Sequence, residues 1–213
     1  MSTLPVVYLA RHGGTAWTIT GQHTGVTDLP LTPEGEEEAI RLGERLEGLT
    51  FVEVTTSPLQ RALRTCQLAA FGSAAEVDPD LREWNYGRYE GRTSAEIHAE
   101  RPDWHLFRHG CPDGESPDQV GERADRVIRR VRAIGEGDVL LFSSGHFLRV
   151  LVARWLGLPP AAGRYFLLGT ASLSKVGYEH DQSEPAILLW NENPHHEHIS
   201  LARAQQRREK ARL

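Results

Sequence analysis

Short apolar runs alternate along the chain with longer stretches whose apolar side chains recur at the spacing of a helix. Three of the runs are largely apolar and rich in β-branched or aromatic side chains, at residues 6–10, 51–55 and 139–142. Runs of that length and composition are typical of buried strands in a parallel sheet. Two later runs, at 171–178 and 186–190, predict a pair of edge strands joined across a polar turn.

The helical stretches have clear start signals. Thr32 precedes a proline at the first helical position, and Thr93 is followed three residues later by a glutamate. Ser57 and Ser116 each open a capping-box pattern, with proline next and glutamine at the third helical position. A further helix is expected over 146–156. Strands that alternate with helices in this way predict a three-layer α/β/α sandwich with a mostly parallel central sheet.

Length, charge and cysteine content narrow the class of protein. A chain of 213 residues suits a single domain, which we place at 1–190, before a polar and partly basic tail at 191–213. The net charge of −5 argues against a nucleic-acid-binding surface. Because no apolar run suits a signal peptide or a membrane span, we expect a cytoplasmic protein that binds no membrane. Cys66 and Cys111 are too few for a disulfide framework and are expected to be reduced.

Polar residues of one chemical character follow three of the predicted strands. Arg11 and His12 follow the first strand, Arg61 lies just inside the helix that starts near Ser57, and His146 follows the 139–142 strand. Ligands of open parallel sheets bind beyond the carboxyl ends of the strands, so we expect these side chains to converge there. A guanidinium group binds two phosphate oxygens at once through parallel N–H bonds. The N-terminus of a helix also favours the negative charge of a phosphate. The pattern therefore predicts a phosphate site.

Phosphate chemistry at such a site needs a nucleophile and a proton donor. A neutral imidazole can attack phosphorus and hold it as a phosphoramidate, which divides one difficult displacement into two easier ones. The departing oxygen then needs a proton. Glu83 lies in a predicted loop between aromatic residues and is the candidate donor.

Several motifs in fixed order carry a resemblance to a known family. They are Arg11-His12-Gly13, Gly25 with Asp28 and Pro30-Leu31-Thr32, Ser57-Pro58-Leu59-Gln60-Arg61-Ala62, the 83–91 segment, and Gly145-His146. In this order they resemble the histidine phosphatase superfamily, which includes the cofactor-dependent phosphoglycerate mutases. The 21–25 and 111–116 segments and Phe147-Leu148-Arg149 look most like a branch of small-molecule phosphatases, some of which act on sugar phosphates and bisphosphates.

The resemblance implies a fold and a set of roles. It implies a phosphoglycerate mutase-like sandwich in which His12 is phosphorylated and Glu83 donates a proton and then activates water. Arg11 and Arg61 would hold the phosphoryl oxygens, and His146 would bond to them. The substrate-binding side would be formed by Thr18, Gln22, Thr24, Gly25, Tyr86 and Gly145. His23, in the same loop, is a further candidate.

The chain departs from the family pattern at three positions. Gly14 stands where most relatives have glutamate, Thr18 where they have asparagine or serine, and Ser144 where this branch commonly has histidine. Loss of a carboxylate at position 14 could alter the hydrogen bonds around Arg11 or His12. None of the residues assigned to catalysis is missing, so we expect an active enzyme.

We therefore expect a phosphatase that acts through phosphohistidine on small phosphorylated metabolites, with no metal and no cofactor. The short segment after Glu83 favours hydrolysis over a phosphoglycerate mutase, which must keep the phosphohistidine dry. Two more functions are compatible with these residues. One is a non-catalytic phosphate-binding protein, which Gly14 would permit, and the second is a metal-dependent hydrolase that uses His12, His23 and His146. The expected binding partner is the small phosphorylated substrate. A homodimer is a possible oligomeric state that the sequence does not decide.

Overall fold

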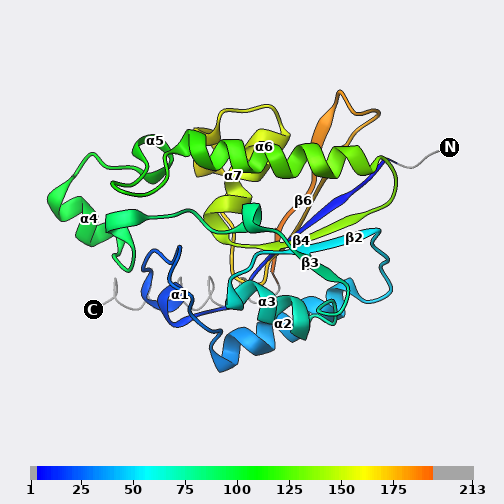
Figure 1. Cartoon of the computed structure of the whole chain (residues 1–213), viewed down its shortest axis with the longest axis horizontal. Coiled ribbons are helices and arrows are strands. Elements are labelled where there is room, and N and C mark those ends of the chain that lie inside the picture. The colour runs from blue at the N-terminus through cyan, green and yellow to red at the C-terminus, as the bar shows by residue number, and fades with distance from the viewer. Residues whose placement is uncertain (1–3, 194–213) are drawn as a thin grey trace, which may run out of the picture.

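The computed structural model describes residues 4–193, and these form a single mixed sheet flanked by helices (Figure 1). The sheet has six strands in the order β3-β2-β4-β1-β5-β6. Strands β1, β2, β3 and β4 are parallel to their neighbours, whereas β5 runs antiparallel to β1 and β6 antiparallel to β5. The strands are β1 (Val7–Arg11), β2 (Glu53–Thr56), β3 (Ala75–Val77), β4 (Val139–Ser143), β5 (Leu173–Tyr178) and β6 (Pro185–Glu192).

Side chains of the central strands alternate between two hydrophobic cores. Val7 and Leu9 of β1 face the core that contains the apolar residues of α6 (Pro117–Ile134) and α7 (Gly145–Trp155). Tyr8 and Ala10 face the opposite core, with residues of α2 (Pro33–Leu46) and α3 (Gln60–Leu68). Both faces of the strand are buried because each is covered by helices, which confirms the predicted three-layer sandwich.

Shorter elements connect this framework. They are α1 (Ala16–Thr20), α4 (Ser94–Glu100), α5 (Leu106–His109) and the 3-10 turns η1 (Pro79–Leu81), η2 (Gly87–Tyr89) and η3 (Pro160–Tyr165). The predicted capping boxes at Ser116 and Thr93 are confirmed, at the starts of α6 and α4. Their side chains accept backbone N–H groups that have no partner within the helix.

Three details of the predicted elements are wrong. The helix α3 begins at Gln60, without a side-chain cap from Ser57 or Leu59, because Asp28 from a distant loop accepts the Gln60 backbone N–H at 2.8 Å. The short strand β3 carries no apolar run that could have predicted it. The strand β5 lies inside the sheet, between β1 and β6, so only β6 of the predicted pair is an edge strand.

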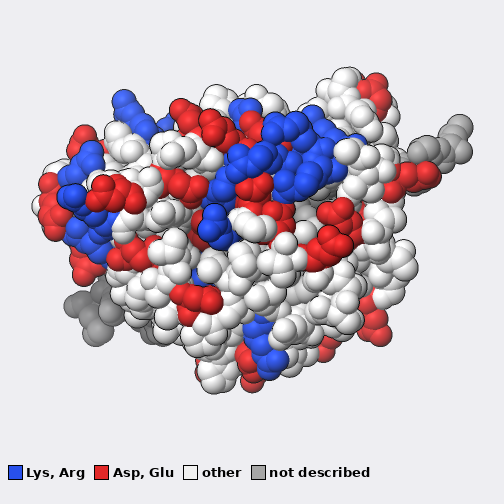
Figure 2. Space-filling view, in the orientation of Figure 1, with Lys and Arg blue, Asp and Glu red and all other residues white. Residues whose placement is uncertain are grey.

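Charged side chains are unevenly distributed over the surface. Lys and Arg side chains gather along α6, with acidic side chains among them (Figure 2). In this cluster Arg126 pairs with Asp80 at 2.7 Å, and Arg130 pairs with Asp78 and Asp80.

No helix within residues 4–193 is long and apolar enough to cross a membrane. Residues 191 and 192 of the predicted tail belong to β6, and the part of the tail beyond Asn193 lies outside the described residues.

Candidate active site

The predicted site residues meet where β1, β4 and β2 end. His12 follows β1, its backbone N–H donates to the Ser143 carbonyl at the end of β4, and Arg61 lies in the first turn of the helix after β2. These three strands are neighbours in the sheet and run parallel, so their carboxyl ends lie together at one edge of it, where ligands of such sheets bind. The close approach of the His12 loop to α2 requires glycine, because a Cβ on Gly13 would lie 2.2 Å from the Gly35 carbonyl oxygen.

His12 is buried and held in one tautomer. Its Nδ1 lies 2.7 Å from the Gly13 carbonyl oxygen, which can only accept a hydrogen bond. The proton therefore sits on Nδ1, and Nε2 keeps a lone pair and has no hydrogen-bond partner among the described residues. Burial, followed by the positive charges of Arg61 and Arg11, holds the pKa of His12 well below its usual value. The ring is thus uncharged, with a free lone pair on Nε2.

Two buried guanidinium groups flank this histidine. Arg11 Nη1 donates to the Leu168 carbonyl at 2.5 Å, and Arg61 donates to the carbonyls of Thr24, Gly25 and Thr27 at 2.9 to 3.1 Å. The Nε atoms of both arginines are buried and have no partner within residues 4–193. Buried donors without an acceptor are unfavourable, so these two atoms are available as donors to an anionic ligand.

His146 lies in the first turn of α7, the helix that follows β4. A Cβ on the preceding Gly145 would lie 3.1 Å from the Arg11 guanidinium carbon, so the glycine lets that side chain pack against the backbone. The Tyr86 hydroxyl lies 2.5 Å from His146 Nδ1. Burial, followed by the charges of Arg149, His23 and Arg11, holds the pKa of His146 well below its usual value.

The Glu83 carboxylate is bound to the start of α7. Its Oε2 accepts the His146 backbone N–H at 2.9 Å, and its Oε1 accepts the backbone N–H groups of Phe147 and Trp84 at 2.8 Å. The negative charge of Glu83 also acts on both Arg11 and Arg61. The structure therefore brings Glu83 together with the two arginines and His146.

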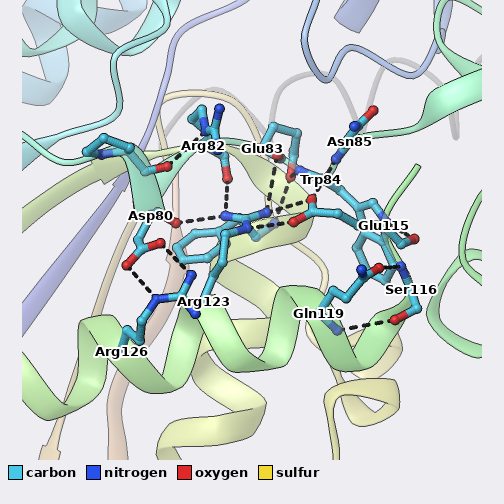
Figure 3. Close-up of polar contacts among 12 residues, drawn as sticks. Asp80, Arg82, Glu83, Trp84, Asn85, Glu115, Ser116, Gln119, Arg123 and Arg126 are labelled. Atoms are coloured by element: carbon cyan, nitrogen blue, oxygen red, sulfur yellow. Dashed lines mark hydrogen bonds and ion pairs between the residues drawn. The ribbon is translucent and has the colours of Figure 1, made fainter. Parts of the chain in front are cut away.

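Arg123 holds the segment that carries Glu83. This buried side chain of α6 donates to the carbonyls of Asp80, Arg82 and Glu83 and forms a double ion pair with Glu115, at 2.7 and 2.8 Å (Figure 3). Glu115 in turn accepts the Asn85 backbone N–H at 2.8 Å. These bonds fix the backbone on both sides of Glu83.

Glu38 provides a carboxylate near the position of Gly14. Its Oε2 accepts the Gly14 backbone N–H at 2.9 Å, and its charge acts on Arg11. A negative charge is thus present beside the arginine although position 14 lacks a side chain. Ser144, another departure from the family pattern, is fully buried, and its hydroxyl has no partner within the described residues.

Several of the residues predicted to bind substrate form hydrogen bonds within the protein. Thr18 closes the capping box of α1 through its hydroxyl, which lies 2.8 Å from the Thr15 backbone nitrogen. Gln22 donates to the Gly91 carbonyl at 2.7 Å, and the Thr24 hydroxyl donates to the Gln22 carbonyl. These bonds shape the loop that receives Arg61. His23 stacks beside the Tyr86 ring, with centroids 4.7 Å apart, and burial lowers its pKa to about 4.

Two contributors were not predicted from the sequence, Glu38 and Arg123. Arg123 lies on the apolar face of its helix, beside Val120, Ala124 and Val127, and an arginine in that register is a signal of a buried ion pair. Glu38 lies in a run of glutamates and has no such signal. Within residues 4–193 no group of three or more His, Cys, Asp or Glu side chains is arranged to hold a metal ion, so His12, His23 and His146 form no such group.

Comparison with known proteins agrees with this arrangement. The sequence pattern of the histidine phosphatase superfamily, branch 1, matches residues 7–193. The chain belongs to this superfamily. It is 42% identical over 183 residues to an acid phosphatase of Mycobacterium tuberculosis, which covers 84% of this chain and 90% of that protein. It is 38% identical over 191 residues to a sedoheptulose 1,7-bisphosphatase of Saccharomyces cerevisiae, which covers 74% of this chain and 69% of that protein.

The fold of this histidine phosphatase is also similar to solved structures. The solved structure of the protein encoded by an open reading frame of Mycobacterium tuberculosis matches this fold with a TM-score of 0.83 at 39% sequence identity. The match covers 88% of this chain and 97% of that chain. The predicted fold and family are therefore confirmed.

Proposed function

We propose that this chain is a phosphatase that hydrolyses phosphomonoesters of small metabolites through a phosphohistidine intermediate on His12. The observation that carries the proposal is the state of His12. It is buried and uncharged, its Nδ1 proton is bound to Gly13, its Nε2 keeps a lone pair, and the ring feels the charges of Arg61 and Arg11, whose Nε atoms are buried without a partner within residues 4–193. A base without a proton, next to donors for an anion, is suited to attack a phosphoryl group.

In the first step His12 Nε2 forms a bond to phosphorus as the bond from phosphorus to the leaving oxygen breaks. Glu83, protonated for this step, gives its proton to the departing alkoxide. Arg11, Arg61 and His146 donate hydrogen bonds to the three oxygens of the transferred group, whose charge they stabilise. The products are an alcohol and a phosphohistidine.

In the second step water attacks the phosphohistidine. Glu83 takes a proton from that water, the bond between Nε2 and phosphorus breaks, and inorganic phosphate leaves with His12 neutral again. Each carboxyl oxygen has two lone pairs. Oε2 uses one for the His146 N–H, so the second lone pair is free for this proton.

The proposed substrates are sugar phosphates or sugar bisphosphates. The similarity to a protein named sedoheptulose 1,7-bisphosphatase supports this class, as does the similarity to an acid phosphatase. Both described cysteines are unpaired and buried, which is in keeping with the proposed cytoplasmic location. A homodimer stays a prediction.

The test is hydrolysis of p-nitrophenyl phosphate by the wild type and by His12→Ala, each with and without excess chelator. We expect chelator-resistant turnover that His12→Ala abolishes, because no other described residue replaces the nucleophile. His180→Ala is the matched control, since His180 is exposed on the turn between β5 and β6. Turnover that the chelator removes would contradict the mechanism.

The same assay, extended to sugar bisphosphates and to phosphoglycerate, with both phosphate release and phosphoglycerate isomers measured, distinguishes hydrolysis from phosphoryl transfer and from binding alone. A phosphoglycerate mutase would move phosphate between carbons of phosphoglycerate without releasing it. A non-catalytic protein would bind phosphate and turn over neither substrate. Either result would overturn the proposed hydrolysis.

A further inference from the structure

Two aromatic side chains meet through one short hydrogen bond beside the phosphate-binding residues. The Tyr86 hydroxyl lies 2.5 Å from His146 Nδ1 and has no other hydrogen-bond partner within residues 4–193. Tyr86 is only 1% exposed. If Nδ1 carried the proton, the phenolic hydrogen would be buried without an acceptor, which is unfavourable. The hydroxyl therefore donates, and Nδ1 accepts.

This bond decides what His146 can offer to a ligand. A neutral imidazole carries a single proton, so an Nδ1 that accepts leaves the proton on Nε2. Nε2 has no hydrogen-bond partner among the described residues. His146 thus presents an N–H donor, whereas His12 presents a lone pair at the same ring position, because its Nδ1 donates to Gly13. Two different neighbours set two identical side chains in opposite tautomers.

We propose that Tyr86 is a positioning residue whose hydroxyl fixes the ring orientation of His146 and its Nε2–H tautomer, so that this N–H donates to the transferred phosphoryl group. The role of His146 in this inference rests on the proposed function. The Tyr86 hydroxyl thus binds His146, whereas the family resemblance implies that Tyr86 contacts the substrate.

The surroundings of both rings favour the neutral pair. Burial raises the pKa of Tyr86 well above its usual value, so the phenol keeps its proton. His146 faces the positive charges of Arg149 on its own helix and Arg11 from β1, and also His23. Glu83 accepts its backbone N–H. Ring contacts with Phe107 and His23, with centroids 5.4 and 5.9 Å away, limit how far the imidazole can tilt.

The first measurement is made on the wild type and does not depend on activity. Nitrogen-15 NMR of the histidine-labelled wild type near pH 8, with His146→Gln to assign the signals, reports which ring nitrogen carries the proton. We expect a proton on Nε2 and none on Nδ1. A proton on Nδ1 would overturn the proposal, whether or not the chain is a phosphatase.

The second measurement compares Tyr86→Phe with Tyr89→Phe, a matched control that also removes one hydroxyl from a buried ring. Within residues 4–193 the Tyr89 hydroxyl has one hydrogen-bond partner, Arg101, at 3.4 Å. We expect kcat/KM of Tyr86→Phe to fall roughly tenfold, by the same factor for p-nitrophenyl phosphate and for an alkyl phosphate, because a donor to the phosphoryl oxygens serves both.

We also expect the NMR titration of His146 to move to higher pH in Tyr86→Phe, because Nδ1 loses the donor that favours the neutral ring. A purely structural role of the phenol would not produce this shift. An unchanged titration, or a loss of activity no larger than in Tyr89→Phe, would overturn the proposal. If Tyr86→Phe fails to fold, the wild-type tautomer alone decides. A wild type with the expected tautomer but no turnover would refute the proposed function and not the hydrogen bond.

Discussion

The Glu83 side chain binds the start of α7 and is also the proposed proton donor. The residue before α7, Ser144, forms no side-chain cap, and the Glu83 carboxylate accepts the N–H groups of His146 and Phe147 instead. These are backbone donors of the first turn that have no partner within the helix. The negative charge also lies at the positive end of the helix dipole. The bonds hold the proposed proton donor at a fixed place relative to His146.

Replacement of Glu83 by glutamine tests its role as proton donor. We expect kcat/KM for an alkyl phosphate, which reports formation of the phosphohistidine and not its hydrolysis, to fall by about 10²-fold or more, because the leaving alkoxide needs a proton. We expect much less loss for 2,4-dinitrophenyl phosphate, because that leaving group departs as a stable anion. Rates for the two substrates, measured on the same preparations, provide the check.

The two-substrate comparison also controls for structural damage. Glutamine presents an NH₂ group where one carboxylate oxygen accepts a backbone N–H, so some loss of stability is expected. Such damage would lower both rates alike. Equal losses would therefore argue against proton donation by Glu83.

At the scale of elements, long-range polar contacts fix the ends of helices and the loops between them. Asp28 caps α3 from a loop, and Arg123 connects α6 to the carbonyls of the 80–83 segment. Arg123 is 6% exposed, its ion pair with Glu115 is mostly buried, and its guanidinium lies 4.9 Å from the Phe147 ring centroid. The position of Glu83 thus depends on a helix that contributes no reacting group.

We expect Arg123→Met to destabilise the protein by about 3 to 5 kcal/mol, because it leaves Glu115 and several buried carbonyls without a partner. Arg126→Met on the same helix is the control. Its pair with Asp80 is partly exposed, and we expect a loss of about 1 kcal/mol or less. Urea unfolding measures both values. Equal losses would show that the Arg123 network does not hold this segment.

At the scale of the whole molecule, uncharged histidines in the interior make stability depend on pH. The pKa values of His12 and His146 lie well below the usual value, and that of His23 is about 4. In the unfolded chain these histidines titrate near pH 6.5. Between pH 6.5 and 4 the unfolded chain therefore binds more protons than the folded one. Stability rises with pH across this window and is lost as the pH falls through it.

His23→Gln should make this loss smaller. Full titration of His23 over the window corresponds to about 3 kcal/mol, because its pKa drops from 6.5 to about 4 on folding. We expect the free energy of unfolding to fall less between pH 7 and 4.5 in this variant than in the wild type. Urea unfolding at the two pH values is the measurement. An unchanged difference would show that His23 is charged in the folded protein.

The exposed His180 is the control residue for this experiment. It lies on the β5–β6 turn beside Glu184, with a side chain that is 74% exposed. His180→Gln should leave the pH dependence as in the wild type. A change of similar size in both variants would attribute the effect to general charge and not to burial.

Local patterns in the amino-acid sequence were enough to predict the layered fold, the main helices and the family. Apolar runs and helix starts are local signals, because a strand buried on both faces must be apolar and a helix start needs an acceptor for its free N–H groups. The order of the Arg11-His12-Gly13, Arg61 and Gly145-His146 motifs was equally local. Their convergence followed from the rule that parallel strands end at a common edge.

The hydrogen bonds that hold each of these residues come from parts of the chain that are distant in sequence. Asp28 at α3, Glu83 at α7, Glu38 at Gly14 and Arg123 at the 80–83 segment act across sequence separations that no local pattern encodes. The tautomers of His12 and His146 also depend on hydrogen bonds in the folded structure. A ring's tautomer depends on which donor or acceptor touches Nδ1, and for His146 that atom belongs to Tyr86, sixty residues away along the chain.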